Sequence, residues 1–96
     1  MNTAAKRSIA MEASVDISLY PLADEYIPAI NEFIERVQQY PSIAAVRNDF
    51  STQLFGDYEQ IMELLKIEIR QSWEQFGKSI LVVKILGGGF RGLSSG

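Results

Sequence analysis

Hydrophobic and polar residues alternate strictly along residues 12–20, and this pattern dominates the start of the chain. The apolar set is Ala13, Val15, Ile17 and Leu19, and the polar set is Ser14, Asp16, Ser18 and Tyr20. A period of two predicts a β-strand with one face in the core and the other outside it. The second face would carry a carboxylate, two hydroxyls and a phenol.

Two segments have the three-and-four spacing of amphipathic helices. The first runs from Ile27 to Tyr40, and Pro41 ends it because a residue before proline avoids the helical region. The second begins at an Asp57 cap and ends at Gly77. Its expected buried stripe is Tyr58, Ile61, Met62, Leu65, Ile69, Ser72, Trp73 and Phe76, with Lys66, Glu68 and Arg70 on a solvated face.

Three further extended segments, 44–48, 51–55 and 79–86, complete a β-α-β-β-α-β order. Two right-handed crossovers of this kind predict an α+β, ferredoxin-like fold, with a four-stranded antiparallel sheet and two helices on one face. We expect the domain to cover residues 11–86. Residues 1–10 would be a flexible N-terminal extension and residues 87–96 a flexible glycine-rich tail.

The last predicted strand is apolar on both sides over residues 80–83, so both faces of the sheet are expected to be covered. The helices would cover one face. A second copy of the chain is the simplest cover for the other. The pattern therefore predicts self-association through the sheet face, as a dimer or a tetramer.

Composition narrows the chemistry. The 96 residues contain no cysteine and no histidine, which removes thiolates, the usual general base and the usual transition-metal ligands. The net charge of −3 disfavours nucleic acid as a partner, and no segment approaches the length of a membrane span. The N-terminus lacks the apolar core of a secretory signal. We expect a cytoplasmic protein with no cofactor, no bound metal, and neither nucleic acid nor membrane as a partner.

Polar residues of the first and third strands can converge, because the first strand is central in this fold and the third is its neighbour. Asp16 or Ser18 would then meet Ser51, Thr52 or Gln53, and strand parity leaves open which of the last two is included. Carboxylates, hydroxyls and amides together suit a heteroaromatic amine. With Lys84 the only cation expected nearby, this acidic site would disfavour phosphate esters.

The chain resembles the YkoF-like family of thiamine- and hydroxymethylpyrimidine-binding proteins. The residues that carry the resemblance are Ala13–Leu22, Tyr26–Pro28, Asn48–Tyr58 and Val82–Lys84, and it covers about residues 12–86. The most distinctive part is the Ser-Thr-Gln-x-x-Gly-Asp-Tyr segment that begins at Ser51.

The resemblance implies a ferredoxin-like domain that forms oligomers through its sheet and binds a small molecule without catalysis. It also implies ligand-binding roles for Ser18, Asn48, Ser51 and Thr52. Asp16 joins this set on electrostatic grounds, because the thiazolium of thiamine is a permanent cation and a nearby carboxylate stabilises it.

Two alternatives stay open from the sequence. One is a ligand-free dimeric interaction or regulatory domain. The other is a small cofactor-free monooxygenase that oxidises quinol-like substrates, although the absence of histidine leaves only Asp16 or Tyr20 as a base.

Overall fold

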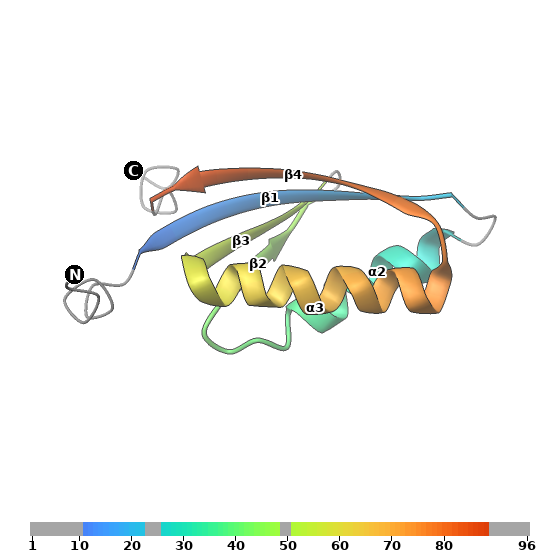
Figure 1. The fold of residues 1–96 in the computed structure, drawn as a ribbon, viewed down its shortest axis with the longest axis horizontal. Helices are drawn as coiled ribbons and strands as arrows, with labels where there is room; N and C mark the ends of the chain where they lie inside the picture. Colours follow the sequence, from blue (N-terminus) through green and yellow to red (C-terminus); the bar gives the residue numbers. More distant parts are fainter. Residues whose placement is uncertain (1–10, 23–25, 49–50, 89–96) are drawn as a thin grey trace, which may run out of the picture.

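The computed structural model describes residues 11–22, 26–48 and 51–88. The elements, in chain order, are β1 (Glu12–Pro21), α2 (Tyr26–Val37), β2 (Ala44–Arg47), β3 (Thr52–Asp57), α3 (Tyr58–Phe76) and β4 (Ser79–Gly87). The predicted β-α-β-β-α-β order and ferredoxin-like class are therefore confirmed (Figure 1). The predicted extension, 1–10, and residues 89–96 of the predicted tail lie outside the described residues.

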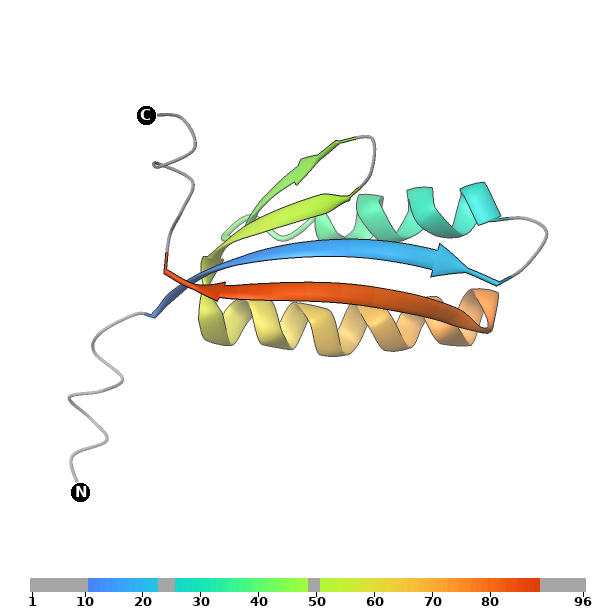
Figure 2. The same cartoon turned by 90° about the horizontal axis from the view of Figure 1, so that it is seen from above.

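The strands form one antiparallel sheet in the order β2-β3-β1-β4, with both helices packed against the same face (Figures 1 and 2). We call the other side, which neither helix covers, the open face. Asp16 in β1 lies opposite Gln53 in β3 and Lys84 in β4. Because directly opposed residues share a face, these three side chains belong to the open face.

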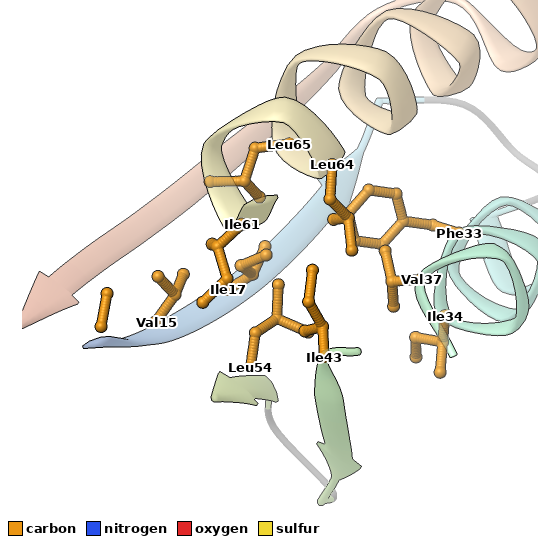
Figure 3. Close-up of a cluster of buried hydrophobic side chains, with 11 residues drawn as sticks. Val15, Ile17, Phe33, Ile34, Val37, Ile43, Leu54, Ile61, Leu64 and Leu65 are labelled. Carbon is orange, nitrogen blue, oxygen red and sulfur yellow. The ribbon is translucent and has the colours of Figure 1, made fainter. Parts of the chain in front are cut away.

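The core lies between the sheet and the two helices (Figure 3). The fully covered side chains come from every layer and include Val15, Ile17, Phe33, Val37, Leu54, Ile61 and Leu64. The alternation in β1 places its apolar set in this core, as predicted. Burial of each such side chain contributes roughly 1.5–3 kcal/mol, so this layer provides most of the driving force for folding.

The ends of α3 follow the predicted capping chemistry. The Asp57 carboxylate accepts a hydrogen bond of 3.0 Å from the Gln60 amide, which satisfies one of the free amides of the first turn. At the other end Gly77 has a φ of 85°, a left-handed conformation that favours glycine. Its amide donates to the Trp73 carbonyl at 2.9 Å and closes the helix.

Two helix predictions were wrong in detail. Helix α2 ends at Val37 rather than Tyr40, and Tyr40 follows the turn beyond the helix, packing partly against the core. In α3 the buried stripe is rotated: Glu68 is only 7% exposed, whereas Trp73 is 50% exposed. Tyr58, also expected inside, is exposed as well.

Glu68 is buried because two partners from the α2 segment meet it. Arg36 Nε lies 2.6 Å from Glu68 Oε1, and the Tyr40 hydroxyl donates to Oε2 at 2.6 Å. Arg36 Nη2 also donates to the Glu68 carbonyl at 3.3 Å. A buried carboxylate is tolerated only when it is paired and hydrogen-bonded in this way. We call Arg36, Tyr40 and Glu68 the helix clamp, because it joins α2 to α3.

Burial, together with the hydrogen bond and the negative charge of Glu68, raises the pKa of Tyr40 to about 12. The folded state therefore holds the phenol proton to higher pH than the unfolded chain does. Its contribution to stability is complete below about pH 10 and is lost as the pH rises towards 12.

Candidate functional site

A pocket of about 100 Å³ opens on the helix side of the sheet, between α2 and the start of β3. Its wall is formed by Ile17, Leu19, Ile30, Phe33, Ile34, Arg47, Asn48, Ser51 and Thr52. Five of these side chains are apolar and the remaining four are polar. A mainly apolar wall with a few placed polar groups is typical of small-molecule sites.

The apolar wall follows directly from the two periodicities of the sequence. Ile17 and Leu19 point to the helix side because they belong to the apolar set of β1. Phe33 and Ile34 follow Ile30 by about one helical turn, so all three lie on the inner side of α2. Figure 3 shows Phe33 and Ile34 projecting from α2 towards the sheet. An aromatic ring and branched aliphatic side chains therefore enclose the space.

The polar rim comes from the connection between β2 and β3. The Asn48 amide donates to the Ser51 carbonyl at 2.9 Å, and the Ser51 amide donates to Asn48 Oδ1 at 2.8 Å. These reciprocal bonds hold both residues at the mouth of the pocket. Thr52, the first residue of β3, is 3% exposed and lies deeper.

Ser51 connects this rim to the open face. Its hydroxyl donates to Asp16 Oδ1 at 2.6 Å, and Asp16 lies beside Gln53 and Lys84 on the side away from the helices. Through this hydrogen bond the carboxylate of Asp16, on the open face, contacts a residue of the pocket wall.

Arg47 is the charged residue among those that line the pocket. It lies directly opposite Thr52 in the β2–β3 pair, so its side chain is directed to the helix side. Its Nη2 donates to Asn31 Oδ1 on α2 at 3.1 Å. The guanidinium thus spans the mouth of the pocket from β2 to α2.

The five residues expected to bind the ligand are divided between the two faces of the sheet. Asn48, Ser51 and Thr52 line the pocket, and Asp16 contacts Ser51. Ser18 lies on the open face, opposite Val82 and outside the pocket wall. Convergence of Asp16 with Ser51 and Gln53 is therefore observed, but Thr52 points to the opposite side.

The expectation that Lys84 would be the only cation near an acidic site was wrong. Lys84 is on the open face, while the described pocket wall contains Arg47 and no carboxylate. Arg47 was missed because its side depends on the register between β2 and β3. The apolar residues of α2 were recognised as a helix face, but no local signal marks them as the wall of a pocket.

Within the described residues, no group of three or more acidic, histidine or cysteine side chains could hold a metal ion. In the same part of the chain, neither helix combines the length and the apolar character needed to cross a membrane.

Known proteins share this architecture. The model of the YkoF-related family matches residues 12–85, which is most of the sequence. The chain belongs to the YkoF-related family. This match confirms the resemblance of this YkoF-related protein to the family, which the sequence indicated. The sequence matches no curated protein.

Solved structures share the fold of this YkoF-related protein at low sequence identity. SP2199 from Streptococcus pneumoniae is 24% identical, with a TM-score of 0.78 over 88% of this chain and 96% of its own. TM0486 from Thermotoga maritima, provisionally assigned to thiamine biosynthesis or salvage, is 19% identical with the same TM-score and coverage. MJ1052 from Methanocaldococcus jannascii is 18% identical, with a TM-score of 0.71 over 88% of this chain and 94% of its own.

Proposed function

We propose that this protein binds thiamine or its hydroxymethylpyrimidine precursor in the pocket beside α2 and acts as a carrier, buffer or sensor without converting it. Family membership and the provisional assignment of TM0486 to thiamine metabolism support a thiamine-related ligand. The observation that carries the proposal is the pocket itself, in which an apolar wall with one aromatic ring meets a rim of hydroxyl and amide groups.

The chemistry of the rim suits an aminopyrimidine. Such a ring is flat and apolar on its faces, with an exocyclic amine that donates and ring nitrogens that accept. Leu19 and Ile30, the partly exposed residues of the apolar wall, can contact the faces, and the side chains of Asn48 and Thr52 carry matching donors and acceptors. A pocket of about 100 Å³ favours entry of a single ring, so the thiazolium of thiamine would extend beyond the mouth.

The residue types of this chain favour binding without catalysis. The chain has no histidine or cysteine to act as base or nucleophile. The pocket wall contributes only neutral hydroxyls, one amide and one guanidinium as polar side chains. A cytoplasmic location is part of the same proposal.

Titration calorimetry with the purified protein tests this function. We expect saturable binding of thiamine and of hydroxymethylpyrimidine, and a rise in melting temperature with each. Choline serves as the control, because it is a permanent cation without a pyrimidine ring. Equal responses to choline and thiamine, or no response to either pyrimidine, would contradict the proposal and favour the ligand-free interaction domain.

The open face supports self-association as a second part of the proposed function. Four aliphatic side chains on this face are between 44% and 53% exposed: Val46, Ile80, Val82 and Leu86. They come from the two edge strands and flank the polar residues of β1. Exposed apolar patches of this kind mark interaction sites. We propose that a second copy of the chain covers this face.

Replacing Val82 with lysine should convert the wild-type oligomer to a monomer of 10.8 kDa, because the new charge would be buried at the contact. Light scattering at micromolar concentration measures the mass. Ile67→Lys is the matched control, since Ile67 is 47% exposed but lies on α3, away from the open face. A monomeric wild-type protein would refute this interface.

A further inference from the structure

We infer that Arg47 makes the pocket selective for an anionic, phosphorylated form of its heteroaromatic ligand. This inference rests on the proposed function and deepens it by naming the ligand class. The preferred ligand would be a phosphomonoester of the pyrimidine, with the ring in the apolar pocket and the phosphate at the guanidinium. Neutral pyrimidine and cationic thiamine would bind more weakly.

Arg47 lies at the mouth of the pocket. Its side chain is directed to the helix side of the sheet by its pairing with Thr52, and it is part of the pocket wall. Asn31 Oδ1 accepts from Nη2 at 3.1 Å and holds the guanidinium across the mouth. A guanidinium has five N–H donors, so one bond to Asn31 leaves donors for a phosphate.

The described surroundings of Arg47 suit a negatively charged ligand. In the described ranges, no carboxylate lies within ion-pair distance of its side chain, unlike Arg36 and Arg70. Asp16 accepts a hydrogen bond from Ser51 and belongs to the open face of the sheet. The side chain of Arg47 is exposed, so its positive charge can meet an anionic group at the mouth.

The size of the pocket brings the charged group of the proposed ligand near Arg47. In a pocket of about 100 Å³, the ring would lie against the apolar wall and its substituent beside Arg47, Asn48 and Ser51, which are polar lining residues. A phosphomonoester there gains a charge-assisted contact that guanidinium geometry favours. The thiazolium of thiamine would instead bring a positive charge towards the same guanidinium.

Calorimetric titration with hydroxymethylpyrimidine and with its phosphate ester tests the inference. We expect the wild-type protein to bind the ester roughly 10- to 100-fold more tightly, as a hydrogen-bonded ionic contact provides. Arg47→Gln should abolish that preference, so that the ester and the unphosphorylated pyrimidine bind with similar affinity. Glutamine can still bond Asn31, and the site is exposed, so the variant should fold.

Lys66→Gln is the matched control. It removes the same charge from an exposed position on α3 that does not line the pocket, so it should retain the preference for the ester. Raising the salt from about 0.05 to about 0.5 M should reduce the wild-type preference, because exposed charges are screened. Inorganic phosphate alone should compete weakly, since it lacks the ring.

The outcomes separate the inference from the function on which it rests. Equal affinity for both pyrimidines in the wild-type protein, or a preference that survives Arg47→Gln, would overturn the role of Arg47 and leave the binding function intact. Competition by inorganic phosphate as strong as that of the ester would overturn joint recognition of ring and phosphate. No binding of either pyrimidine would remove the proposed function itself.

Discussion

Replacing Glu68 with alanine will lower the free energy of unfolding by about 3–5 kcal/mol, the cost of breaking a buried ion pair from one side. The change leaves Arg36, whose side chain is 22% exposed, without its carboxylate, and it leaves the Tyr40 hydroxyl without its acceptor. Arg36 Nη1 is already buried without a hydrogen-bond partner among the described residues, so the loss of Glu68 leaves this buried guanidinium with still fewer hydrogen bonds. Urea unfolding measures the loss from the midpoint and the slope.

A loss of this size is large beside the 5–15 kcal/mol of a typical domain, so a milder variant is needed as well. Glu68→Gln keeps the side-chain shape and a hydrogen bond to Tyr40, and it should cost less than alanine. Glu74→Ala is the matched control, because Glu74 pairs with Arg70 at 3.0 Å on the exposed side of the same helix. Its effect should stay within about 0.5 kcal/mol. Similar losses for Glu68→Ala and Glu74→Ala would show that the helix clamp does not stabilise the fold.

The pH dependence gives an independent measurement of the helix clamp. Burial is the main cause of the raised pKa of Tyr40, and the hydrogen bond and charge of Glu68 add to it. In Glu68→Gln the charge is absent, so tyrosinate absorbance should develop at lower pH than in the wild type. Wild-type stability should fall as the pH rises from about 10 towards 12, because only the unfolded chain releases the phenol proton in that window. Tyr40→Phe should remove that fall.

Replacing Thr52 with valine will weaken binding of hydroxymethylpyrimidine by roughly 10- to 100-fold, the loss expected when a buried ligand group keeps no hydrogen-bond partner. Thr52 is 3% exposed and lines the pocket, and valine has nearly the same shape. The fold should therefore persist, which circular dichroism and the melting temperature verify. Calorimetry measures the affinity.

Ser18→Ala is the comparison that distinguishes the two sides of the sheet. Ser18 belongs to the resemblance motif but lies on the open face, opposite Val82. If the ligand occupies the pocket beside α2, the alanine variant should retain wild-type affinity. The reverse result, with Ser18→Ala weakened and Thr52→Val unchanged, would place the ligand on the open face instead.

The sequence by itself determined the fold because its local signals agree. The alternation along β1, the helical spacing of the two amphipathic segments, and the Asp57 and Gly77 caps all lead to one topology. The same alternation correctly placed Ile17 in the core and Asp16 outside it. The family resemblance depended on the same residues and was confirmed over residues 12–85.

Tertiary structure alone decided the rotation of α3. Glu68 has the residue type of a solvated position, and only the approach of Arg36 and Tyr40 from another segment makes its burial tolerable. Trp73 has the residue type of a core position, yet the inner side of α3 near its end is occupied by Ser72. Hydrophobic spacing specifies that a helix has an inner side, but the neighbours decide which residues lie there.

Tertiary structure also decided which candidate residues share a pocket. Asp16, Ser18, Ser51 and Thr52 are close in the sheet, but the register between β1 and β3 sends Thr52 to the helix side and Asp16 to the other. A shift of one residue would exchange those sides, and no local pattern in the hairpin specifies the pairing. Arg47 reaches the pocket through the register between β2 and β3, so its charge became part of the site only when those strands paired.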